Sequence, residues 1–103
     1  MNKRKTPPAK ENTTLALAWY RPDQWTLLHA VSTDSEQLEE QYAEWLEYAE
    51  QEFKKLQSEG FRVVKLDVDV NDIIRWCTEQ GRPLDGNARA EYATRKLREQ
   101  QQG

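Results

Sequence analysis

The sequence predicts an α/β fold, with α+β as the alternative, in which two strands and four helices follow in the order β-α-α-β-α-α. Three observations predict it. A short apolar run occupies residues 13–20, an alternating apolar and polar run occupies residues 61–70, and apolar residues recur at helical spacing between and after these runs. At 103 residues, the chain suits one domain with a single core.

The first twelve residues differ in composition from the rest of the chain. They contain four basic residues, one acid, two prolines and no apolar periodicity, so we expect a flexible basic tail over residues 1–12. The domain is then expected over residues 13–100, with residues 101–103 as a frayed end. The run from Thr13 to Tyr20 is mostly apolar, which is typical of a strand buried on both faces.

The next segment carries the signals of a short helix. Pro22 suits the first helical position, where its missing N–H is no loss, and Asp23 suits the positive end of the helix dipole. Trp25, Leu28 and Val31 would face the core. We expect this helix to stop near Thr33.

The strongest helical pattern predicts an acidic amphipathic helix from Ser35 to Glu59. Its apolar stripe consists of Leu38, Tyr42, Trp45, Leu46, Ala49, Phe53 and Leu56. Gly60 is expected just past its end, in the left-handed conformation. Eight acids from Asp34 to Glu52 repel one another, so the stripe and not the charge should stabilise this helix.

The alternation from Phe61 to Val70 predicts a half-buried second strand. A third helix, capped by Asn71, would follow and end at Gly81. Two strands rarely make a stable sheet alone, and each would present an unpaired edge. We therefore expect a homodimer, in which pairing between two copies gives a four-stranded sheet.

The last predicted helix is capped by Asn87 and runs from Ala88 to roughly Arg98, with Tyr92, Ala93 and Leu97 facing inward. Four basic residues on it would face largely outward and could contact the phosphates of a nucleic acid together with the basic tail. They are Arg89, Arg95, Lys96 and Arg98. The acidic middle of the chain, residues 13–72 with a net charge of −8, weighs against this interpretation.

Several familiar chemistries lack their residues. The glycines have neither of the phosphate-loop spacings, and a single Cys77 and a single His29 cannot form a usual zinc site or an internal disulfide. Asp67 and Asp69 alternate as calcium ligands do, but the loop would place Asp72 where glycine is needed. We therefore predict no metal, no cofactor and no nameable catalytic group.

Two other candidate surfaces each have a structural alternative. The acidic helix could bind a basic protein partner through Glu40, Glu44, Glu47 and Tyr48. It could instead be a solvated face held by packing of its apolar stripe, or could meet the basic last helix of the same or another subunit. Trp19, Arg21 and Trp25 could form a ligand-binding corner, or could belong to the core.

The sequence contains no apolar run long enough for a transmembrane helix or a signal peptide, so we expect no membrane contact and cytoplasmic residence. The leading functional hypothesis is a non-enzymatic, homodimeric protein-interaction or regulatory module. The alternative is a small nucleic-acid-associated regulator that uses the basic tail and the last helix.

Overall fold

The computed structural model describes residues 13–102 and contains the predicted order of elements. Strand β1 (Thr14–Tyr20) leads through a 3₁₀ turn, η1 (Pro22–Gln24), into α2 (Trp25–Val31), a second turn, η2 (Ser35–Gln37), and α3 (Tyr42–Ser58). Strand β2 (Arg62–Val68), α4 (Val70–Gln80) and α5 (Gly86–Gln102) complete the fold. The α/β prediction is confirmed, while the predicted tail, residues 1–12, lies outside the described residues.

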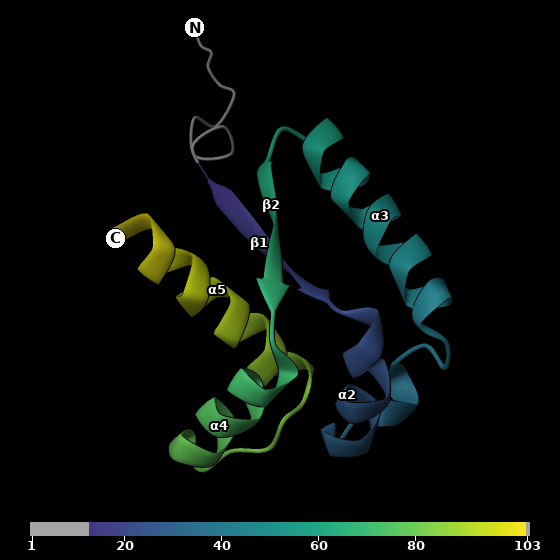
Figure 1. The fold of residues 1–103 in the computed structure, drawn as a ribbon. Coiled ribbons are helices and arrows are strands. Elements are labelled where there is room, and N and C mark those ends of the chain that lie inside the picture. Colours follow the sequence, from purple (N-terminus) through teal and green to yellow (C-terminus); the bar gives the residue numbers. More distant parts are fainter. Residues whose placement is uncertain (1–12, 103) are drawn as a thin grey trace, which may run out of the picture.

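The two strands pair with each other in parallel within one chain, from Thr14 beside Arg62 to Tyr20 beside Val68. Parallel pairing needs a long crossover, which α2 and α3 provide. Figure 1 shows α3 and α5 on either side of the sheet, with α2 and α4 beyond the carboxyl ends of the strands. Those ends are therefore where loops from different parts of the chain meet.

The core lies where the carboxyl half of the sheet meets the helices. Its largest fully buried side chains are Leu28, Val68, Val70 and Ile73. Gly81 has a φ of 65° at the end of α4, and Gly60 a φ of 99° after α3, so both helices end on a glycine in a conformation that other residues rarely adopt. The predicted helix ends are confirmed.

The long helix begins later than predicted. It starts at Tyr42, while Ser35–Gln37 form a 3₁₀ turn and Leu38 is extended. The reason is a contact with α2, because Trp25 Nε1 donates to the carbonyl oxygens of Glu39 and Glu40, which a continuous helix would use internally. Gln41 then caps α3 through a reciprocal capping box.

Other boundaries also differ from the predictions. Strand β2 ends at Val68, and Asp69 rather than Asn71 caps the next helix, since the Asp69 carboxylate accepts from the Asn71 N–H at 2.9 Å. Helix α5 starts at Gly86 rather than Ala88, with the Asp85 carboxylate accepting from the Ala88 N–H, and it continues to Gln102.

Strand β1 is not buried on both faces as predicted. Only Tyr20 is buried along it, and the other six residues are half-buried. In the described part of the chain, β1 has a neighbouring strand on one side only, so its other edge lies near the surface.

Candidate functional site

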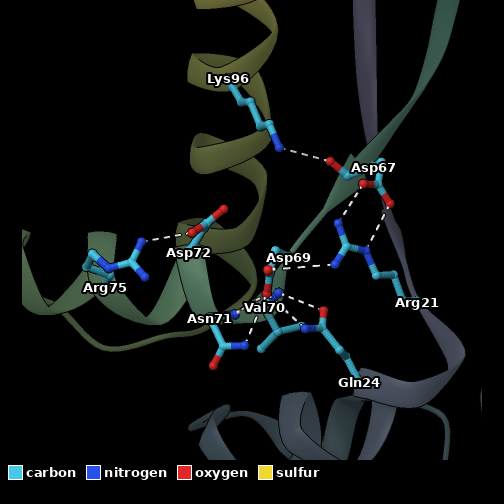
Figure 2. A network of polar contacts seen from close by, with 9 residues as sticks. All are labelled: Arg21, Gln24, Asp67, Asp69, Val70, Asn71, Asp72, Arg75 and Lys96. Atoms are coloured by element: carbon cyan, nitrogen blue, oxygen red, sulfur yellow. Dashed lines mark hydrogen bonds and ion pairs between the residues drawn. The ribbon is translucent and has the colours of Figure 1, made fainter.

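Polar side chains gather at the carboxyl ends of the two strands, where α/β proteins commonly hold ligands. Figure 2 shows Arg21, just after β1, turned toward Asp67 on β2. Its Nε and Nη2 lie 3.2 and 2.8 Å from the two Asp67 carboxylate oxygens, and its Nη1 lies 3.7 Å from Asp69 Oδ2. This bidentate pair joins the ends of the strands.

Gln24 completes the connection beneath this pair (Figure 2). Its Nε2 donates to Asp69 Oδ1 at 2.8 Å, and its Oε1 accepts from the Val70 N–H at 2.9 Å. Asp69 Oδ1 also accepts from Asn71. One amide side chain therefore links η1 to the first turn of α4.

The two carboxylates are held in their charged form. The hydrogen bond from Arg21 lowers the pKa of Asp67, and the hydrogen bonds from Gln24 and the Asn71 backbone lower the pKa of Asp69. A general acid needs a raised carboxyl pKa, which is the opposite shift. Among residues 13–102 no group of three or more acidic, His or Cys side chains is placed to hold a metal ion. The arrangement suits a structural role, in which these polar contacts hold η1, β2 and the start of α4 together.

The predicted ligand corner is divided between two environments. Trp19 and Trp25 both pack against Trp45 of α3, with ring centroids 5.5 and 5.4 Å apart, and Trp25 is buried. Arg21 instead turns to Asp67 and Asp69. The aromatic residues hold α2 and α3 against the sheet.

Cys77 and His29 also have separate surroundings. Cys77 is buried in the core, and burial raises the pKa of its thiol. His29 has its Nε2 2.7 Å from the Glu39 carbonyl oxygen and its ring against Trp25. These surroundings do not support the possible pairing of Cys77 as nucleophile with His29 as base.

Three of the four basic residues proposed for nucleic-acid contact have partners within the chain. Arg89, expected to face outward, is instead largely enclosed with its side chain 11% exposed, and it makes a bidentate pair with Asp34 at 2.9 and 3.0 Å. Lys96 donates to the Asp67 carbonyl oxygen, and the Arg95 guanidinium lies 6.0 Å from the Trp76 ring centre. Arg98 is exposed.

The acidic side of α3 is open, as predicted. Glu40, Glu44, Glu47 and Tyr48 are exposed, and Tyr48 retains 63% of its surface. A shallow hollow of about 560 Å³ is lined by Glu39, Glu44, Glu47, Tyr48 and Gln51. Glu44 has a structural use as well, because its Oε1 accepts from the Gln41 N–H in the capping box.

A mostly apolar groove beside this hollow was not predicted. It has a volume of about 530 Å³ and runs along β1 between α3 and α5. We call it the β1 groove. Its lining residues include Ala16, Leu17 and Ala18 of β1, Trp45, Tyr48, Ala49 and Glu52 of α3, Arg89, Ala90 and Ala93 of α5, and Glu39.

Successive residues of β1 point their backbone N–H and C=O groups alternately toward β2 and away from it. The Arg62 N–H donates to the Thr13 carbonyl, so odd-numbered residues of β1 point their backbone groups toward β2. The even-numbered residues point away from β2. The Tyr20 carbonyl agrees, because it accepts from the Tyr42 hydroxyl at 2.8 Å.

Ala16 and Ala18 therefore direct both their N–H and C=O groups into the groove. Within residues 13–102, neither forms a hydrogen bond to a side chain or loop. The signal was present in the sequence, since the run Leu-Ala-Leu-Ala in β1 is uncharged while β2 carries Lys65 and Asp67. An uncharged strand edge is the kind that accepts another strand.

No helix in the described part of the chain is long and apolar enough to cross a membrane. A scan against protein-family models, a search of curated proteins and a search of solved structures each gave no match.

Proposed function

We propose that this chain is a non-enzymatic protein-interaction module that acts as a homodimer, in which the β1 strands of two copies pair and form a four-stranded sheet. The observation that carries this proposal is the outward edge of β1 in an apolar groove. Backbone groups on such an edge gain hydrogen bonds when a second strand is added.

The two edges of the sheet differ, which favours pairing at β1. The outer edge of β2 carries charged residues, and the Asp67 carbonyl on it is occupied by Lys96 at 3.0 Å. Charges of this kind protect a strand edge from further pairing. Strand β1 has no charged residue from Thr14 to Tyr20.

The packing of α3 supports the same proposal. None of its residues is fully buried, although its apolar stripe runs the length of the helix. Tyr42 and Trp45 pack against the core while remaining half-buried, and Tyr48 stands exposed beside the groove. A second copy at the β1 edge would cover apolar surface that one copy leaves in water.

Paired proline substitutions test the proposal. Ala16→Pro removes an N–H on the β1 groove, whereas Val63→Pro removes one on the outer edge of β2, and neither removes a hydrogen bond between the two strands. In size-exclusion chromatography with light scattering, we expect a dimer for the wild type and for Val63→Pro, and a monomer for Ala16→Pro. Circular dichroism checks that both variants fold.

A wild-type protein that is monomeric at micromolar concentration would contradict the proposal. A dimer that tolerates Ala16→Pro but dissociates with Val63→Pro would place the interface on the wrong edge. The alternative of nucleic-acid binding has less support, because Arg89, Arg95 and Lys96 are engaged within the chain.

A further inference from the structure

The proposed dimer has a consequence for the direction of the second chain. Two identical strand edges related by a two-fold axis pair in antiparallel orientation. The groove is lined by Ala16, Leu17 and Ala18, so an axis near Leu17 places Ala16 of one copy opposite Ala18 of the other. The backbone groups of both residues then point at each other.

This orientation fixes where the residues before β1 of the second copy go. Thr14 of one copy lies opposite Tyr20 of the other, so the preceding residues continue past the carboxyl end of the first copy's β1. The amino end of α3 lies there, since the Tyr42 hydroxyl bonds to the Tyr20 carbonyl. The hollow lined by Glu39, Glu44 and Glu47 is at the same end of α3.

The charges on the two sides are opposite. Residues 1–12 carry four bases, Lys3, Arg4, Lys5 and Lys10, against one acid. Glu39 and Glu52 line the groove, and the adjoining hollow adds Glu44 and Glu47; we call these four acids the acidic rim. Opposite charges across an interface set its orientation and accelerate association.

The length of the segment before β1 also suits the length of helix α3. A fully extended chain spans about 3.3 Å per residue, so a segment of this length could carry Lys10 up to about 13 Å and Lys3 up to about 36 Å from Thr14. Helix α3 has 17 residues and is about 25 Å long. Residues 1–12 of one copy can therefore reach the whole acidic side of α3 in the other.

We propose that residues 1–12 of each copy lie across the acidic rim of the other copy's β1 groove, so that the basic and acidic segments of the chain neutralise each other within the dimer. This inference rests on the proposed dimer and adds a second, electrostatic contact to it. An antiparallel pairing of the two sheets places both acidic α3 helices on the same face, where they repel each other. The basic residues of the two tails would offset this repulsion.

A charge exchange between two variants tests the inference. The first variant reverses the tail with Lys3→Glu, Arg4→Glu, Lys5→Glu and Lys10→Glu. The second reverses the rim with Glu39→Lys and Glu47→Lys, leaving Glu44 in place because it caps α3. A control, Glu59→Lys with Glu79→Lys, reverses two exposed acids that line neither the groove nor the adjoining hollow.

Each variant alone should form a dimer about tenfold weaker than the wild type, and the control should match the wild type. Mixed in equal amounts, the tail variant and the rim variant should form mostly heterodimers in native mass spectrometry. In such a heterodimer, the acidic tail of the first variant faces the basic rim of the second. The basic tail of the second variant faces the acidic rim of the first. The wild-type dimer should also weaken as salt concentration rises.

The outcomes separate this inference from the proposed function. A dimer whose affinity is unchanged by tail reversal and strengthened by salt would overturn the docking of residues 1–12 while leaving the dimer intact. Loss of affinity in both variants without heterodimer preference would assign each tail to its own copy, which also overturns the inference. A monomeric wild type would contradict both proposals.

Discussion

Replacing Arg89 with alanine tests the most enclosed charged pair in the described structure. Arg89 and Asp34 lie 55 residues apart in the chain, and their side chains are 11% and 16% exposed. Asp34 accepts two hydrogen bonds from the guanidinium and a third from the Gly86 N–H at 2.9 Å. The pair joins the turn after α2 to the start of α5.

The expected cost follows from this enclosure. Arg89→Ala leaves the Asp34 carboxylate nearly buried with one remaining backbone donor, and it also removes the bond to the Ser32 hydroxyl at 3.0 Å. Breaking one side of a buried ion pair costs about 3 kcal/mol, a large part of the stability of a domain this size. The midpoint of thermal unfolding should fall by about 15 °C.

The matched control is Arg21→Ala. The Arg21 and Asp67 side chains are 41% and 70% exposed, so solvent screens their attraction, and the loss of stability should be much smaller than that for Arg89→Ala. Urea unfolding followed by tryptophan fluorescence measures both values, at one fixed protein concentration because association adds to stability. Equal losses for the two variants would refute the reasoning from burial.

The pH dependence of stability gives an independent check. The hydrogen bond from Arg89 lowers the pKa of Asp34 in the folded state, so the unfolded chain takes up a proton more readily. The contribution of Asp34 to stability is therefore complete above about pH 4, the ordinary carboxyl value, and disappears as pH falls below it. In Arg89→Ala, the free energy of unfolding should therefore fall less steeply as pH decreases below about 4. The contributions of Asp67 and Asp69 to this pH dependence should remain.

Three further predictions concern single residues. In a Cys77→Ser background, Leu17→Cys should form a disulfide between copies on a non-reducing gel and Val64→Cys should not, because only residue 17 lies at the proposed two-fold axis; the reverse result would exclude this register. Gly81→Ala should cost about 1 kcal/mol in urea unfolding, since a φ of 65° strains any Cβ although nothing lies within 4 Å of it. The Cys77 thiol should react with Ellman's reagent only after denaturation, because it is buried and its pKa is raised; rapid reaction of the native protein would disprove its burial.

Local signals predicted the order of the elements well. Pro22, Gly60 and Gly81 mark the ends of segments through their own backbone preferences, and the structure places them at those boundaries. The alternation in the second strand likewise distinguished a half-buried strand from a helix. Such features depend on neighbours in sequence, which a single chain displays.

Contacts between distant segments account for the errors. The stripe that includes Leu38 fits a helix, but the carbonyl groups of Glu39 and Glu40 bind Trp25 instead. Arg89 fits an exposed helical face, but Asp34 lies opposite it once the chain folds. The β1 groove forms only when β1, α3 and α5 are packed together. The sequence therefore indicated that a strand edge would be unpaired, but not that this edge would lie in a groove along β1.

The parallel sheet also determines when the protein can fold during synthesis. Among residues 13–102, strand β1 has no hairpin partner, and the residues that pair with it, from Arg62 to Val68, follow almost half a chain later. The ribosome must therefore complete both intervening helices before the sheet can close, and long-range closure of this kind is slow. Until then both edges of β1 are available, so nascent chains on one messenger would meet each other at the strand that we propose joins the mature dimer.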